Sequence, residues 1–139
     1  MNSLPRPHET LHFQNAIGKL FYQPAGYVRL AWGPDRVTLD VVQAYYEQAL
    51  ALLRRTDVRR ILSDHGQRAP LAAATQEWLT TNWIPRAMRE THTQHCAIVE
   101  GADPMHRLST QSVISLAPKE FVFKRFDTVE QAEEWLFAH

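Results

Sequence analysis

The sequence predicts an α/β domain: a five-stranded mixed sheet with about four helices, in the order ββαβαβαβα. Three observations predict this class. Short runs of strand-forming residues alternate with longer segments whose apolar residues recur at helical spacing. The first two strand runs are joined by a tight turn, which makes them antiparallel, whereas helices separate the later runs and make them parallel. The length of 139 residues suits one domain.

The N-terminal residues are predicted to lie outside the folded domain. Residues 1–10 contain two prolines and few apolar anchors, so we predict a flexible N-terminal tail. The remaining residues, 11–139, are expected to form a single domain. Leu11 and Phe13 are interpreted as a short extension of the first strand.

The first two strands form a hairpin. Residues 17–23 are rich in strand formers, and residues 27–32 alternate between two faces. Gln23-Pro24-Ala25-Gly26 between them has the composition of a type I turn. We therefore predict that only the first strand is antiparallel to its neighbour. The parallel strands are expected near residues 60–64, 95–99 and 121–126.

Helix boundaries follow from capping signals. Thr38 can cap the first helix, Asp103 with Pro104 opens the third, and Thr128 with Gln131 matches a capping box before the last. The second helix contains Pro85, which removes a backbone donor, so we expect a kink or break there. The predicted helices lie near residues 38–55, 75–90, 104–116 and 128–138.

The composition argues against several functional classes. Lys+Arg and Asp+Glu number 15 each, so there is no basic surplus to favour nucleic acid or an anionic membrane surface. No apolar run approaches the ~20 residues that a membrane span needs, and the start of the chain does not resemble a signal peptide. A single cysteine, Cys96, fits a reducing compartment. We predict a cytoplasmic protein.

The motifs of common enzyme classes are absent from the sequence. There is no G-x-S-x-G, Walker or dinucleotide-binding glycine motif, and Cys96 lies in an apolar run that does not activate a thiol. His92 and His95 lack the companions of a zinc site. We therefore predict no catalytic residue, no metal and no cofactor.

A polar pair, Asp64 and His65, lies at the end of the strand that is predicted at residues 60–64. Ligand sites in open α/β sheets gather beyond the carboxyl ends of strands, which makes Asp64 and His65 candidates for acid–base or ligand chemistry. Adjacent residues of an extended segment point to opposite sides, which argues against a direct Asp–His dyad. The alternative is that Asp64 bonds the amides of its loop and His65 is exposed.

Two tryptophans mark a second candidate surface. Trp78 and Trp83 are five residues apart, so they lie on different parts of the helix circumference. Either both pack into the core, or one is exposed and marks a partner-binding surface, because tryptophan is enriched at interface hot spots. We expect a homodimer with one of them in its interface.

The order of five short stretches resembles the STAS-like proteins, which are related to anti-sigma-factor antagonists and share a fold with CRAL-TRIO domains. The stretches are Leu30-Ala31-Trp32-Gly33, Ile61-Leu62-Ser63-Asp64, Thr75-Gln76-Glu77-Trp78 with Trp83-Ile84-Pro85-Arg86, Cys96-Ala97-Ile98-Val99, and Arg125-Phe126-Asp127 before Ala132-Glu133-Glu134-Trp135-Leu136. The resemblance covers residues 17–137 and is greatest to small bacterial proteins.

The resemblance implies a regulatory role, with one departure. Phosphorylatable relatives carry an Asp-Ser pair after the central strand, whereas this chain continues from Asp64 through His65 to Arg68 with no serine. The nearest hydroxyl is Thr75, at the start of the second helix. Candidate ligand or partner-binding residues are therefore Asp64, His65, Arg68, Thr75, Trp78 and Trp83.

Three functions follow from these observations, in order of preference. The first is a non-enzymatic STAS-like interaction or regulatory domain that binds protein partners, itself among them. The second is a small-molecule or lipid-binding domain of CRAL-TRIO type, which requires an apolar cavity. The third is a small enzyme that uses Asp64 and His65. The predicted partners include no nucleic acid.

Overall fold

The computed structural model describes residues 4–66, 68–101 and 103–139. Its strands are β1 (Thr10–Asn15), β2 (Gly18–Gln23), β3 (Tyr27–Trp32), β4 (Arg60–Asp64), β5 (His95–Val99) and β6 (Val122–Phe126). Its helices are α1 (Leu39–Thr56), α2 (Ala73–Trp78), the π-helical segment η1 (Leu79–Trp83), α3 (Ile84–Thr91), α4 (Pro104–Leu116) and α5 (Val129–Phe137). The predicted α/β class and mixed sheet are confirmed.

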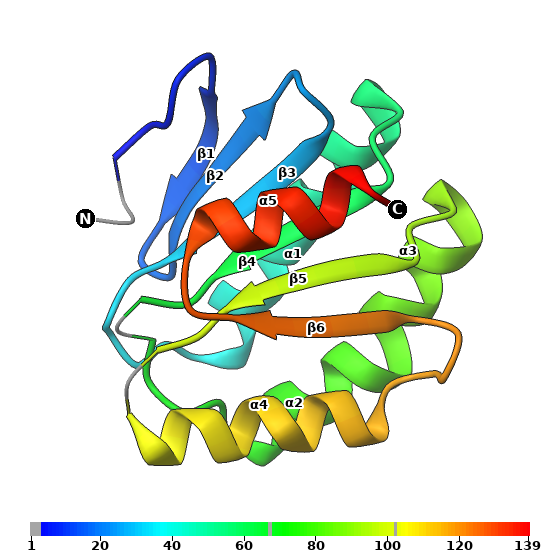
Figure 1. Ribbon diagram of the computed structural model, residues 1–139. Coiled ribbons are helices and arrows are strands. Elements are labelled where there is room, and N and C mark those ends of the chain that lie inside the picture. Colours follow the sequence, from blue (N-terminus) through cyan, green and yellow to red (C-terminus); the bar gives the residue numbers. More distant parts are fainter. Residues whose placement is uncertain (1–3, 67, 102) are drawn as a thin grey trace.

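The sheet contains six strands in sequence order, β1 to β6 (Figure 1). β2 is antiparallel to both β1 and β3, and the pairs from β3 to β6 are parallel. The prediction of five strands with one antiparallel pairing was wrong, because residues 10–15 form a separate strand that pairs along β2.

A turn between Asn15 and Gly18 creates the additional strand. Oδ1 of Asn15 accepts a hydrogen bond from the Ile17 amide at 3.0 Å, which fixes the turn locally. A Cβ atom on Gly18 would lie 2.2 Å from the carbonyl oxygen of Ala31, so only glycine allows β2 to begin this close to β3. The predicted turn at the end of β2 is present, since the Gly26 amide donates to the Gln23 carbonyl at 2.9 Å.

Helices cover both faces of the sheet, unequally. α1, the continuous stretch α2–η1–α3, and α4 lie on one face, and α5 alone covers the other (Figure 1). The larger core lies under the first group and includes Leu30, Ile61 and Ile98 of the central strands. The smaller core joins Leu62 and Ala97 to α5. Successive side chains of β4 therefore point alternately into the larger and the smaller core.

The helix ends agree with the capping signals at two of three places. The Asp103 carboxylate accepts from the Met105 amide, and the Thr128 hydroxyl accepts from the Gln131 amide. Thr38 precedes α1 but makes no side-chain bond to the helix backbone. Thr38 thus occupies the predicted N-cap position of α1, and its carbonyl accepts from the Val42 amide, but its hydroxyl bonds to Asp40 instead of a helix amide.

The expected break at Pro85 takes the form of a widened turn. The Ile84 amide donates to the carbonyl of Leu79, five residues earlier, and Pro85 then occupies the first turn of α3. Proline has no amide to donate and its ring clashes with the preceding turn. The π-helical segment accommodates both effects, so residues 73–91 remain helical throughout.

Candidate functional site

The six candidate residues lie in different environments. Asp64 and His65 leave β4 toward opposite faces, as an extended backbone requires. Asp64 lies on the face covered by α5, and His65 and Arg68 lie on the face covered by α1–α4. Thr75 and Trp83 are buried in the second helical stretch, and Trp78 is half-buried there. The structure therefore brings only His65 and Arg68 together.

Asp64 belongs to a buried ionic network. Its carboxylate accepts from Nη1 of Arg29 at 3.1 Å, and the Arg29 guanidinium also donates to both carboxylate oxygens of Glu9 at 2.8 and 2.9 Å. The three side chains are at most 6 % exposed. Burial raises the pKa of Asp64 above its usual value, and the charge of Arg29 acts in the opposite direction. Arg29 is thus a partner of Asp64 that the sequence did not predict, and the predicted bonds to the loop amides stay a prediction.

The N-terminal segment covers this network. Nη2 of Arg29 donates to the carbonyl oxygen of Leu4 at 2.8 Å, and Arg6 forms ion pairs with Glu130 and Glu133 of α5. Residues 4–9 therefore lie between β3 and α5. The flexibility of residues 1–10 stays a prediction, and residues 1–3 lie outside the described residues.

A chain of buried polar groups begins at His65 on the other face. Its Nε2 lies 3.0 Å from the Ser63 hydroxyl and its Nδ1 lies 2.9 Å from Nε2 of His106, in α4. Nδ1 of His106 accepts from Nε of Arg68 at 3.3 Å, and Nη2 of Arg68 donates to the Thr110 hydroxyl at 2.9 Å. All five side chains are buried, so the expectation that His65 is exposed was wrong.

A glycine allows the two loops that carry this chain to meet. A Cβ atom on Gly101 would lie 2.6 Å from the carbonyl oxygen of Gly66 and 3.3 Å from the His106 ring. Gly101 follows β5, and Gly66 follows β4. Only the missing side chain lets α4 start close enough for His106 to reach His65.

The direction of the hydrogen bonds fixes where the imidazole protons are. Arg68 can only donate, so Nδ1 of His106 is unprotonated and Nε2 carries its proton. That proton is donated to Nδ1 of His65, which leaves Nε2 of His65 protonated and donating to the Ser63 hydroxyl. A base that activates serine must accept the hydroxyl proton instead. Ser63, His65 and His106 thus resemble a catalytic triad in spacing but not in proton arrangement.

Electrostatics hold both histidines neutral. Burial, followed by the charge of Arg68, lowers the pKa of His106 to about 4 and that of His65 well below its usual value. Trp32 supports the chain, because its Nε1 donates to the Ser63 hydroxyl at 3.2 Å. Sequence reasoning missed His106, although one signal was available: it shares a helix face with Ser109 and Thr110, which are polar where the core is expected.

The two tryptophans pack against the chain itself. Trp83 is 2 % exposed, and its Nε1 donates to the carbonyl oxygen of Tyr46 at 2.7 Å. Trp78 is half-buried, with its ring centre 6.2 Å from that of Tyr46. Trp83 therefore offers no surface to a partner, and Trp78 offers part of one.

Hollows of very different size lie around these groups. A cavity of about 50 Å³ lies between the sheet and the helices, beside Ser63, His65 and Arg68. A second, of about 230 Å³, lies on the other side of Arg68, between residues 32–37 and 68–75. Both are smaller than the roughly 300–1,000 Å³ of ordinary ligand pockets.

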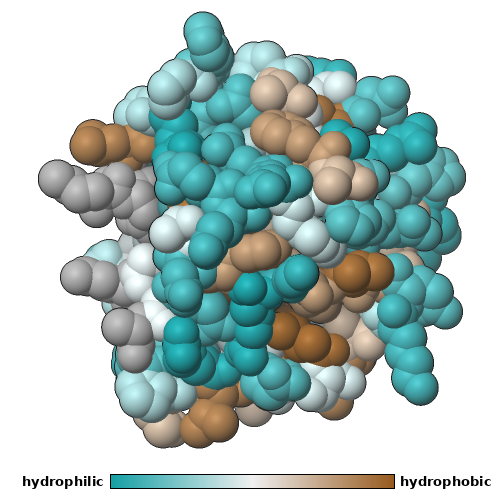
Figure 2. All heavy atoms as spheres, viewed as in Figure 1, coloured by the Kyte–Doolittle hydropathy of each residue, from teal (hydrophilic) through white to brown (hydrophobic). Residues whose placement is uncertain are grey.

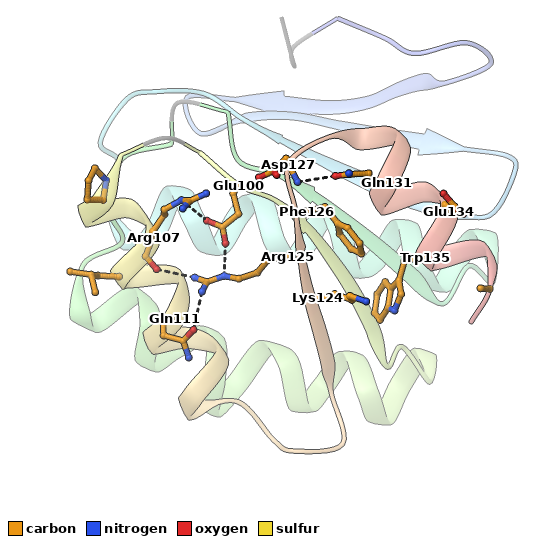
Figure 3. Close-up of a pocket in the computed structure, with 13 residues that line it drawn as sticks. Glu100, Arg107, Gln111, Lys124, Arg125, Phe126, Asp127, Gln131, Glu134 and Trp135 are labelled. Atoms are coloured by element: carbon orange, nitrogen blue, oxygen red, sulfur yellow. Dashed lines mark hydrogen bonds and ion pairs between the residues drawn. The ribbon is translucent and has the colours of Figure 1, made fainter.

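A much larger hollow is an open groove of about 1160 Å³ along β6, with α4 on one side and α5 on the other (Figure 3). Glu100 lies on the α4 side and forms ion pairs with Arg107 and Arg125, and Arg125 also donates to Gln111. On the α5 side, the Phe126 ring lies 5.9 Å from the Trp135 ring. No candidate residue from the sequence lines this groove.

Comparisons with models of protein families, with curated proteins and with solved structures found no match. Fold and site thus define a mixed α/β domain with an open sheet edge and a buried polar chain. No helix formed by the described residues is long and apolar enough to cross a membrane. The cytoplasmic location stays a prediction.

Proposed function

We propose that this chain is a non-enzymatic, STAS-like protein-interaction domain that pairs first with a second copy of itself through the β6 edge. The observation that carries this proposal is that β6 is an edge strand of the sheet formed by the described residues, beside a groove lined by exposed Leu108 of α4 and half-buried Trp135 of α5. The relation to STAS-like proteins is part of the proposal, supported by the order of strands and helices.

The free edge of β6 presents backbone groups at two residues. The Val122 amide donates to Gln94, and the Phe126 carbonyl accepts from Glu100, so residues 122, 124 and 126 bond toward β5. Strand alternation then directs the amides and carbonyls of Phe123 and Arg125 outward. None of the hydrogen bonds of the described residues uses these four groups. Such an edge is a template for another strand.

Basic side chains often protect an edge, but here they turn back onto their own chain. The Arg125 guanidinium donates to Gln111 and to the Arg107 carbonyl oxygen, both at 2.9 Å. The Lys124 ammonium lies 5.7 Å from the centre of the Phe126 ring. The backbone of β6 is therefore accessible to a partner strand.

Apolar exposure is concentrated around this edge. Figure 2 shows apolar residues among hydrophilic ones on the face that carries α5 and β6. Of the exposed large apolar side chains, four lie on α4 and β6, namely Met105, Leu108, Leu116 and Val122, whereas Leu4 and Leu11 lie elsewhere and Phe137 of α5 lies against Tyr27 of β3. A second copy fits this edge because antiparallel pairing of two β6 strands is self-complementary. The zero net charge also leaves little repulsion between copies.

Leu108 lines the groove and is 63 % exposed in the single chain. In the proposed dimer this position is buried, so the carboxylate of Leu108→Glu would lose its water, and self-association is expected to weaken at least about tenfold. Sedimentation across micromolar concentrations measures the change. The matched control is Leu11→Glu, at a 48 % exposed leucine on the opposite edge strand, which should leave the association unchanged.

Hydrogen exchange tests the strand pairing itself. With rising protein concentration, the amides of Phe123 and Arg125 should gain protection, while those of Val122, Lys124 and Phe126 are already bonded to β5. A chain that stays monomeric at 100 µM (an order-of-magnitude upper concentration for weak dimers) would exclude the second copy as partner.

The alternative functions have less support. The cavity of about 50 Å³ between the sheet and the helices is too small for a lipid. For an enzyme, Asp64 and His65 face opposite sides, and His65 donates to Ser63. We therefore keep the interaction domain as the single proposal.

A further inference from the structure

Arg68 is a buried cation with no carboxylate of the described residues at ion-pair distance, and Glu100 acts on its charge only from farther away. Arg68 is only 6 % exposed, and it takes part in none of the ion pairs among the described residues. Its two hydrogen-bond acceptors, His106 and Thr110, are both neutral, and its third contact is the Trp32 ring at 4.6 Å. Buried charges in proteins are normally paired, so this one requires an explanation.

The guanidinium of Arg68 keeps donors that no hydrogen bond of the described residues uses. A guanidinium has five N–H groups, and the bonds to His106 and Thr110 use Nε and Nη2 but not Nη1. Arg68 lines the cavity of about 230 Å³, whose walls include the apolar side chains of Val37, Pro70 and Leu71. A donor at an apolar wall is well suited to one oxygen ligand, because little else there competes for it.

A second polar group faces the same cavity. Thr75 is 4 % exposed and lines it, yet its hydroxyl takes part in none of the hydrogen bonds of the described chain. A hydroxyl that lines a cavity and has no partner in the chain is available to a ligand that enters the cavity. Arg68 and Thr75 thus line one hollow with donors that take part in no hydrogen bond of the described residues.

The entrance to the cavity is exposed and carries a further cation. Arg36 and Asp35 line it from the loop after β3, and both are exposed. No ion pair of the described residues joins Asp35 to Arg68, so the carboxylate at the entrance does not neutralise the buried guanidinium. An anion entering past Arg36 would meet Arg68 inside.

We propose that Arg68 and Thr75 bind a small oxyanion in this cavity, between the loop that follows β3 and the loop that follows β4. Oxyanions accept several hydrogen bonds and match the planar fork of arginine. The volume limits the ligand to a free anion such as phosphate, or to the phosphate end of a larger molecule that projects past Arg36. This site is independent of the β6 edge, which lies at the far side of α4.

Titration calorimetry of the full chain with inorganic phosphate tests the proposal, with chloride at matched ionic strength as the reference. Binding should also raise the melting temperature, because the ligand binds the folded state alone. A phosphate monoester in place of phosphate separates the two sources: comparable affinity indicates the end of a larger molecule, and loss of affinity indicates a free anion. No binding of either ligand to the wild type would overturn the proposal.

Variants locate the site. Arg68→Met removes the charge-assisted bonds and should weaken phosphate binding at least about tenfold. Thr75→Val keeps shape and volume while removing the hydroxyl, and should weaken binding about two- to tenfold even if Arg68→Met folds poorly. Arg89→Gln removes an exposed arginine of α3, outside the cavity, and is the matched control for charge. Equal affinities for wild type, Thr75→Val and Arg89→Gln would show only non-specific attraction and contradict the site.

Discussion

Arg29→Met is expected to lower the free energy of unfolding by about 3–5 kcal/mol, the usual cost of leaving a buried ion-pair partner uncompensated. Methionine fills a similar volume but leaves the carboxylates of Glu9 and Asp64 buried without their shared cation. The N-terminal segment also loses the bond from Arg29 to Leu4. Urea unfolding of the two proteins measures the difference.

A neutral version of the network separates charge from packing. Combining Arg29→Met with Glu9→Gln and Asp64→Asn removes all three charges at once, and well-packed neutral replacements of buried ion pairs are often tolerated. The triple variant should therefore be more stable than Arg29→Met alone. If Arg29→Met were as stable as the wild type, the network would contribute nothing to the fold.

Acidification from pH 7 to pH 5 is expected to lower the free energy of unfolding by about 2 kcal/mol through His106 alone. Its pKa is about 4 in the folded protein, against an ordinary value near 6.5 in the unfolded chain. The unfolded state thus binds a proton first as the pH falls, so stability is lost between about pH 6.5 and pH 4 and is fully present above that range. His65, whose pKa is also lowered, acts in the same direction.

His106→Gln provides the comparison. Removing this titrating group should flatten the pH dependence between pH 7 and pH 5, where carboxylates remain mostly ionised. His92→Gln, at an exposed histidine that ends α3, is the control and should keep the wild-type slope. Equal slopes for His106→Gln and the wild type would mean that His106 is not held neutral by its surroundings. Histidines that do not contact His106 contribute equally to both proteins and cancel in the difference, whereas His65 is bonded to His106 and its lowered pKa depends partly on it, so the flattening measures the pair.

The oxyanion site and the histidine chain are physically coupled through Arg68. The charge of Arg68 helps to lower the pKa of both His65 and His106, and burial lowers the pKa of Arg68 itself to about 10. An anion at Arg68 would offset that charge and raise the pKa of both histidines. Phosphate should therefore reduce the acid sensitivity described above, and the same unfolding experiment with and without phosphate measures this.

Local sequence signals were sufficient for most of the architecture. The amphipathic stripe of α1, the cap at Asp103 and the capping residues at Thr128 and Gln131 act within a few residues, so their effect can be read without the rest of the chain. The extra strand β1 was missed because its pattern is weak. Its existence depends on the turn at Asn15 and on the close approach of Gly18 to Ala31.

The sequence by itself determined the α/β class, the hairpin, the helices with their break before Pro85, and the opposite directions of Asp64 and His65. Only the tertiary structure decided which groups meet: Arg29 with Asp64, His65 with His106, and Arg68 with neutral acceptors and an empty side. The physical reason is distance along the chain. Helical spacing and caps depend on neighbours within one turn, whereas these contacts join residues 35 to 41 positions apart and exist only once the sheet has aligned its strands.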